Sequence, residues 1–213
     1  SIIMLWLGGA GGGHLLTATV SLVPLVTWSL LSSPYQMQRL ISFVHGADPL
    51  GAGFQISQSL LALGSGGFVG VGLGDSVQKY FLPEPHTDFV FAFIGEELGL
   101  AGCLSVIALF GAFAIHGYRI ACNSSTYHGF LLAAGFTVMI SVYAVINISV
   151  VTGFLPTTGL PLPLVSYGGS SLLWNLSGIG ILVAVARENT SSSIASGRKP
   201  ARFNILSKWK QAF

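Results

Sequence analysis

Charged residues are scarce in this chain. Asp, Glu, Lys and Arg make up only 8% of its 213 residues, about a third of the share in an ordinary soluble domain, while 52% of the residues are hydrophobic and the mean hydropathy is +0.74. Apolar runs long enough to cross a membrane accompany this shortage of charge. The composition therefore excludes a soluble globular protein and predicts one integral membrane domain.

Cysteine is nearly absent as well. Cys103 lies inside an apolar run and Cys122 lies just past its end. If that run is helical, the two residues are about 28 Å apart, which is far beyond the reach of a disulfide bond. The chain therefore has no disulfide framework, and we expect both thiols to be free.

Four apolar runs are long enough to be membrane helices, and the end of a cut span precedes them. The spans are Leu15–Leu31, with Pro24 as a kink, Phe89–Ile120, His128–Val151 and Tyr167–Ala186, and the cut span ends over Ile2–Leu7. We expect an all-α, polytopic membrane protein whose transmembrane domain covers residues 1–190. Because Ser1 begins within an apolar run, we expect the chain to be the C-terminal piece of a larger protein.

Basic residues gather at the C-terminal end, where we expect a flexible tail over residues 191–213. Six of the nine Lys and Arg residues follow Ala186. A basic tail suits either nucleic acid or the cytoplasmic flank of a membrane protein, and in so apolar a chain we favour the flank, with no nucleic-acid partner. Alternation of the spans then places 75–88 and 152–166 outside the cell and Arg119–Tyr127 inside.

Arg39 bears on one further crossing. It follows a span, so the positive-inside rule places it in the cytoplasm. Because residues 75–88 are expected outside, Phe54–Leu73 would then have to cross the membrane. That segment is polar at Gln58 and rich in glycine, so we expect neighbouring helices to shield it.

A short polar island stands out at Tyr80–Asp88, which reads Y-F-L-P-E-P-H-T-D. Scarce charges that gather beside a membrane span usually mark a site. Asp88 directly precedes an apolar run, and a carboxylate that is partly removed from water there is a stronger base. Alternatively, Thr87 or Asp88 caps the helix that follows. Lys79, Glu84 and His86 could bind an anionic headgroup, hold a metal ion or steady the loop, and they do not specify a metal site.

Two adjacent carboxylates, Glu96 and Glu97, follow within the apolar run. They point about 100° apart on a helix, so we expect one to be hydrogen-bonded inside the bundle and the other to line a wet cavity or a proton relay. The glycine-rich run Gly64–Gly74 lacks the strand and the G-K-S/T of a nucleotide-binding loop. It favours close helix packing or a loop that faces a lipid headgroup.

The second outer loop, residues 152–166, contains three prolines and leads into the stretch Ser-Tyr-Gly-Gly-Ser-Ser at residues 166–171. Hydroxyls and bare backbone N–H groups at a helix N-terminus can hold a phosphate, although a capped helix start gives the same pattern. No His or Asp partner of a serine hydrolase accompanies this stretch. The candidate binding residues are Ser166, Tyr167, Gly168, Gly169 and Ser170.

Four segments carry a resemblance to a known family. They are Q-S-L-L-A-L-G-S-G-G (Gln58–Gly67), G-L-G-D-S-V-Q-K (Gly72–Lys79), L-P-E-P-H-T-D-F-V-F-A-F-I-G-E-E-L-G (Leu82–Gly99) and L-P-L-V-S-Y-G-G-S-S (Leu162–Ser171). The chain resembles the SEDS proteins of bacteria, whose name stands for shape, elongation, division and sporulation. It resembles their division branch, FtsW, more closely than their elongation branch, RodA. This resemblance implies a ten-span bundle, of which the chain would hold about five to six spans.

The resemblance also implies an activity, that of a peptidoglycan glycosyltransferase in the bacterial plasma membrane that polymerises lipid II. Asp88 matches the family's essential acidic residue and would be the general base. Lys79 or a divalent ion, Mg²⁺ or Mn²⁺, would offset leaving-group charge, and no cofactor is certain. The implied partners are a class B penicillin-binding transpeptidase and other division proteins. We expect both outer loops to form one extracytoplasmic site.

Two other functions remain open for such a chain. One is a lipid II flippase, in which Gln58, Glu96 and Glu97 would line a path through the membrane. The other is a division scaffold that recruits a transpeptidase without chemistry of its own.

Overall fold

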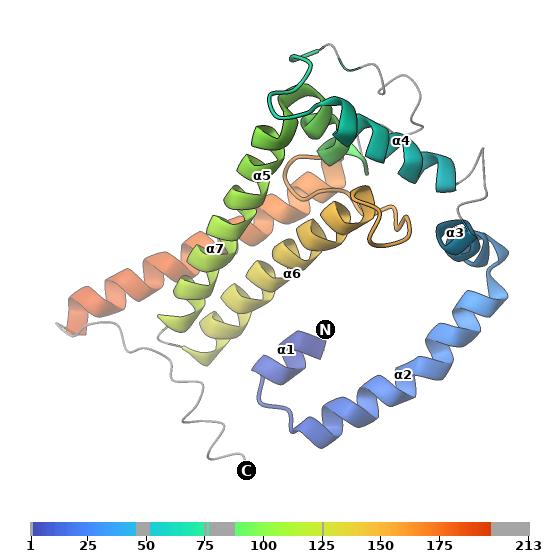
Figure 1. The fold of residues 1–213 in the computed structure, drawn as a ribbon. Helices are drawn as coiled ribbons and strands as arrows, with labels where there is room; N and C mark the ends of the chain where they lie inside the picture. The colour runs from blue at the N-terminus through green and yellow to red at the C-terminus, as the bar shows by residue number, and fades with distance from the viewer. Residues whose placement is uncertain (1, 46–51, 75, 77–87, 125, 197–213) are drawn as a thin grey trace. The chain divides into compact units, whose positions relative to one another are not determined.

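The computed structural model describes residues 2–45, 52–74, 76, 88–124 and 126–196, and every regular element in these ranges is a helix (Figure 1). The expected all-α fold is therefore confirmed. The helices are α1 (Ile2–Leu7), α2 (Gly12–Ser32), α3 (Pro34–His45), α4 (Ala52–Ser65), α5 (Val90–Cys122), α6 (Tyr127–Val151) and α7 (Gly169–Ser196).

Three of these helices are long and apolar enough to cross a membrane. They are α5, α6 and the part of α7 up to Ser191. The protein is thus a multi-pass helical membrane protein, as its composition predicted. Helix α7 continues to Ser196 and so includes the start of the expected tail, because Thr190 and Ser191 donate their hydroxyls to the carbonyls of Ala186 and Arg187 within the helix.

The chain divides into two compact units. The first comprises 1–32, 112–139 and 176–213, and its described core gathers around the buried Phe130. Tyr127 donates its hydroxyl to the carbonyl of Gly8 at 2.8 Å, and the side-chain amide of Asn189 donates to the carbonyl of Ile120 at 3.1 Å. These bonds bring the turn after α1 to the start of α6, and the last turns of α7 to the end of α5.

The second unit comprises 33–111 and 140–175 and contains every candidate site residue that the structure describes. Its core joins the start of α5 to the end of α6 through buried residues such as Phe89, Phe91 and Val151. Helix α4 packs there too, because Ser59 is fully buried and donates its hydroxyl to the carbonyl of Val151 at 3.0 Å.

Helix α5 is broken near its start. Gly99 has φ +66° and ψ −160°, outside the helical region, whereas the sequence predicted one uninterrupted run. The break frees peptide groups on both sides, and the glycine-rich turn after α4 satisfies them. The N–H groups of Val71 and Gly72 donate to the carbonyls of Glu96 and Glu97, and those of Leu100 and Ala101 donate to the carbonyls of Gly67 and Phe68.

Close contact between these two segments depends on the absence of side chains. A Cβ atom at Gly70 would collide with the carbonyl of Glu97, and one at Gly99 would collide with the backbone of Gly70 and Phe68. Both residues also have positive φ, which favours glycine. Close packing, one of the two expectations for the run Gly64–Gly74, is thus seen at Gly70, while Gly64, Gly67 and Gly74 have open surroundings.

The expected crossing over Phe54–Leu73 is corrected by the structure. Helix α4 ends at Ser65 and, at 14 residues, is about 21 Å long, shorter than the ~30 Å hydrocarbon core of a bilayer. Beyond it the chain turns through positive-φ glycines and pairs with α5. The glycines that we expected inside a shielded crossing helix therefore end the helix instead.

Candidate functional site

Asp88 lies just before the first turn of α5, as the sequence predicted. Its side chain is partly buried, and the next residue, Phe89, is only 3% exposed and anchors this end of the helix in the core of the second unit. The carboxylate is therefore carried by a short segment that is fixed on its C-terminal side by packing.

Asn147 of α6 connects this segment to the second loop. Its side-chain Nδ2 donates to the carbonyl of Asp88 at 2.8 Å and to the carbonyl of Leu160 at 2.7 Å. The side chain is 1% exposed. A single buried amide thus holds together two non-helical stretches that are far apart in the sequence.

The carboxylate of Asp88 also lies beside the second loop. A Cβ atom added to Gly159 would be 3.5 Å from Oδ2 of Asp88, so the bare backbone of Gly159 borders the carboxylate. Gly159 has φ +70°, which makes a side chain unfavourable there whatever the space. Contact between the two loops is a necessary part of the expected joint site.

Arg39 of α3 reaches the same loop. Its Nη1 donates to the carbonyl of Thr157 at 2.9 Å, and Thr157 is 7% exposed. The sequence had singled out Arg39 for its charge alone and placed it on the opposite side of the membrane from this loop.

That placement of Arg39 is wrong. Arg39 donates to the carbonyl of Thr157, and Asn147 ties Leu160 of the same loop to the main chain of Asp88, so Arg39 and Asp88 lie on the same side of the membrane. An even number of crossings must then separate them, and the short α4 need not cross. The positive-inside rule describes exposed flanking charges, whereas this guanidinium is partly buried and hydrogen-bonded to the main chain.

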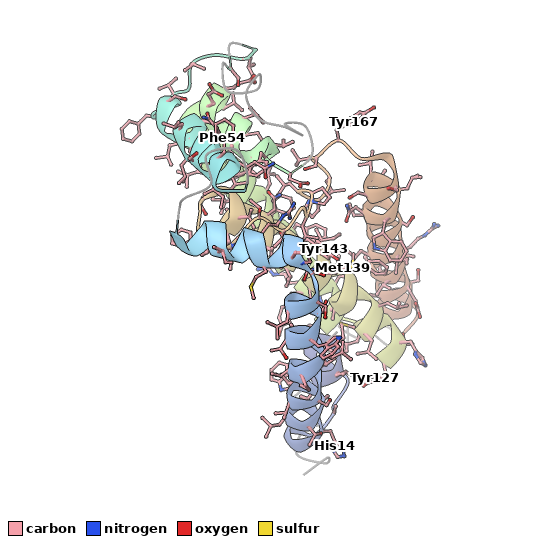
Figure 2. All side chains as sticks on the ribbon, turned by 90° about the vertical axis from the view of Figure 1, so that its right-hand side faces the viewer. His14, Phe54, Tyr127, Met139, Tyr143 and Tyr167 are labelled. Atoms are coloured by element: carbon pink, nitrogen blue, oxygen red, sulfur yellow. The ribbon has the colours of Figure 1, made fainter. Side chains whose placement is uncertain are left out.

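The predicted phosphate-binding stretch occupies the end of the second loop and the start of α7. Ser166 is buried, and its Oγ accepts a hydrogen bond from the N–H of Leu162 at 2.8 Å, which holds the loop's own turn. Tyr167 is 83% exposed and projects from the loop (Figure 2). Gly168 and Gly169 are sterically open, with only Ser171 near Gly168, and Ser170 is exposed. A shared site for these residues and Asp88 stays a prediction.

The intramembrane carboxylates occupy different surroundings. Glu96 is 2% exposed, and its Oε2 accepts a hydrogen bond from the hydroxyl of Ser76, which is equally buried. Glu97 is partly exposed. One of the pair is thus hydrogen-bonded inside the protein, as expected. Gln58 is partly exposed on α4.

Three predicted binding residues, Lys79, Glu84 and His86, lie outside the described residues. In the part of the chain that the structure describes, no three His, Cys, Asp or Glu side chains gather closely enough to hold a metal ion. Both cysteines are free thiols, as the sequence predicted.

Three residues at the site were not identified from the sequence, or not for this role. Asn147 carried a signal, because it is a lone amide within a strongly apolar helix. Arg39 carried one as well, because it is one of only three Lys or Arg residues before Arg187. Gly159 carried none, since a glycine among prolines reads as an ordinary turn.

Comparison with known proteins identifies the family. Residues 1–191 match the family described as cell cycle proteins and named for FtsW, RodA and SpoVE. The chain belongs to this family. The SEDS resemblance is therefore confirmed over all seven described helices except the last residues of α7.

Family members of known name are similar to the chain over most of its length. Stage V sporulation protein E of Bacillus subtilis is 44% identical over 188 residues, which cover 87% of this chain and 51% of that protein. The probable peptidoglycan glycosyltransferase FtsW of Geobacter metallireducens is 41% identical over 188 residues, or 87% of this chain and 50% of that protein. The chain thus spans about half the length of the curated family members that it matches.

One solved structure shares the arrangement of the helices. It is described as "Structural coordination of polymerization and crosslinking by a peptidoglycan synthase complex" and aligns with a TM-score of 0.67 and 29% sequence identity. The alignment covers 87% of this chain and 52% of that one. The chain therefore shares its fold with a chain of a structure described as a peptidoglycan synthase complex.

Proposed function

We propose that the full-length protein is a peptidoglycan glycosyltransferase that polymerises lipid II during cell division. The names of its FtsW relatives support this activity. The observation that carries the proposal within this chain is the carboxylate of Asp88, which lies beside Gly159 on a residue whose main-chain carbonyl Asn147 holds at the head of α5.

Asp88 acts as the general base in this proposal. It removes the proton of the acceptor 4-hydroxyl while that oxygen attacks the anomeric carbon of the donor sugar. The new C–O bond forms as the bond to the diphosphate breaks, and the lipid diphosphate leaves from the opposite face, so the anomeric centre is inverted. Because Gly159 has no side chain, the acceptor can approach the carboxylate without obstruction from this residue.

The negative charge of the departing diphosphate has to be offset. Lys79, a divalent ion or residues beyond this chain are the candidates, and the open glycines at the start of α7 offer backbone N–H groups of the kind that bind phosphate. A divalent ion would supply charge neutralisation when bound. The described residues show no set of three metal ligands, so no step of the proposal depends on one.

A lipid II flippase is the second candidate function. The broken helix α5 favours it, because interrupted helices commonly form the substrate path of transporters. The buried bond between Glu96 and Ser76 favours it less, since this carboxylate already has a partner.

Purified full-length protein and purified lipid II separate the two functions. We expect detergent-solubilised protein to convert lipid II into a ladder of glycan strands on a denaturing gel. Transfer of lipid II across the bilayer of reconstituted vesicles, with no glycan product in either setting, would instead establish the flippase.

The proposed setting is the plasma membrane of a bacterium, with a class B penicillin-binding transpeptidase and other division proteins as partners. The similar structure of a complex that joins polymerisation to crosslinking supports a transpeptidase partner. We place the tail and the segment 119–127 in the cytoplasm, and Asp88 and the second loop outside the cell, because lipid II is polymerised there.

Cysteine labelling in intact cells tests this orientation. In a background without Cys103 and Cys122, an impermeant thiol reagent should label Thr158→Cys and Gln36→Cys, and should label Thr126→Cys only after permeabilisation. All three positions are exposed. Gln36 is the informative position, because it lies on α3 together with Arg39, whose side chain contacts the second loop. If Gln36→Cys, like Thr126→Cys, were labelled only after permeabilisation, Arg39 would lie in the cytoplasm after all.

A further inference from the structure

Asn147 is an unusual residue for its position. It lies in α6, a helix apolar enough to cross a membrane, and its side chain is 1% exposed. Its Nδ2 makes two hydrogen bonds, while its Oδ1 has no partner among the described residues. An apolar side chain would avoid the cost of burying that oxygen.

The two acceptors of Asn147 explain what the amide does. They are main-chain carbonyls of Asp88 and Leu160, one just before α5 and the other inside the second loop. Neither carbonyl lies within a helix. One side chain therefore sets the distance between the segment that carries the carboxylate and the loop beside it.

Other bonds fix the same loop on either side of Leu160. Arg39 holds the carbonyl of Thr157, and Ser166 accepts from the N–H of Leu162. Gly159, which borders the carboxylate, lies between these attachments. Hydrogen bonds therefore hold the loop at several points, and those of Asn147 connect it directly to the main chain of Asp88.

We propose that Asn147 is a positioning residue for Asp88, which acts by holding the main chain of Asp88 at a fixed place against the second loop. This inference rests on the proposed function, because it assumes that the carboxylate of Asp88 takes part in glycan synthesis. The amide contacts no reacting atom. It restricts where the carboxylate can lie, and small displacements of a catalytic group reduce rate far more than they reduce substrate binding.

Asn147→Leu in the full-length protein tests the role. We expect kcat for glycan synthesis to fall by roughly 10–100-fold per molecule of folded, monodisperse protein, with little change in the KM for lipid II. Hydrogen exchange over residues 157–166 should become faster, because the loop loses an attachment. Asn147→Asp, which keeps the shape but can donate at most one of the two bonds, should also lower kcat and covers the possibility that the leucine variant folds poorly.

Ser141→Ala is the matched control. Ser141 lies on the same helix, and its Oγ is also buried without a hydrogen-bond partner among the described residues. Removal of this hydroxyl should leave both kcat and loop exchange unchanged, because it attaches nothing to the site.

The outcomes separate this inference from the proposed function. If Asp88→Asn is inactive but both Asn147 variants retain kcat within about twofold, the positioning role is overturned and the catalytic role of Asp88 stands. A loss that appears only in KM, or only in the yield of folded protein, overturns it as well. If Asp88→Asn is as active as the parent, the proposed general base fails first and the positioning role falls with it.

Discussion

Asp88→Asn should lower glycan-strand synthesis from purified lipid II by about 10²–10⁴-fold, the usual loss when a general base is removed. The amide has nearly the same size as the carboxylate and can still border Gly159, but it cannot accept the proton of the attacking hydroxyl. The main-chain carbonyl of residue 88 remains available to Asn147, so the start of α5 should keep its structure. The measurement is the initial rate of polymer formation by the full-length protein.

A matched acid-to-amide control is available on another part of the chain. Glu188 is exposed near the end of α7, in the other compact unit, and Glu188→Gln should leave synthesis near the parent level. Thermal unfolding in detergent should be similar for both variants. Near-normal synthesis by well-folded Asp88→Asn protein would remove Asp88 from the reaction.

Gly70→Ala should lower the free energy of unfolding by roughly 2–5 kcal/mol. About 1–2 kcal/mol comes from placing a Cβ atom on a residue with φ +88°, and about 1–3 kcal/mol from forcing that atom against its neighbours. The atom would collide with the carbonyl of Glu97, which accepts the hydrogen bond from Gly72. The substitution therefore pushes the turn after α4 away from the break at Gly99 and weakens the hydrogen bonds between them.

Two nearby glycines calibrate this prediction. Gly64→Ala lies within α4, where a Cβ atom would meet nothing within 4 Å, and it should be neutral or slightly stabilising. Gly67→Ala has φ +53° and equally open surroundings, so it should show the backbone cost alone, about 1–2 kcal/mol. Unfolding followed by tryptophan fluorescence in detergent compares the three. Equal stability of Gly70→Ala and Gly64→Ala would contradict the close approach.

The long helices could be predicted because each depends on a property that is local in the sequence. An apolar run of sufficient length gives both ends of α5 and α6 and the start of α7 to within two residues, although α7 continues for ten residues past the predicted end at Ala186. The break at Gly99 depends instead on a partner about 30 residues away. Without the turn at Gly67–Gly72, the sequence of α5 would favour a continuous helix. The hydropathy pattern alone therefore could not reveal the break at Gly99.

The candidate site was predictable in part for the same reason. Asp88 stands out because it is a charge at the edge of an apolar run. Asn147 and Arg39 matter through hydrogen bonds to main-chain carbonyls, and nothing in the sequence states which carbonyl a side chain will meet. The positive-inside rule gave the wrong side for Arg39 because it is a statistical rule about exposed charges, whereas this guanidinium is partly buried and hydrogen-bonded to the carbonyl of Thr157.

The paired segments at the break of α5 have a consequence for how the protein is made. Peptide groups left without partners beside hydrocarbon cost several kcal/mol each, and the turn after α4 supplies partners for those at the break. That turn, Gly66–Gly72, precedes α5 in the chain and leaves the ribosome first. The hydrogen-bond partners of the break are therefore synthesised before the interrupted helix, and a permuted chain that made α5 first would lack them when that helix forms.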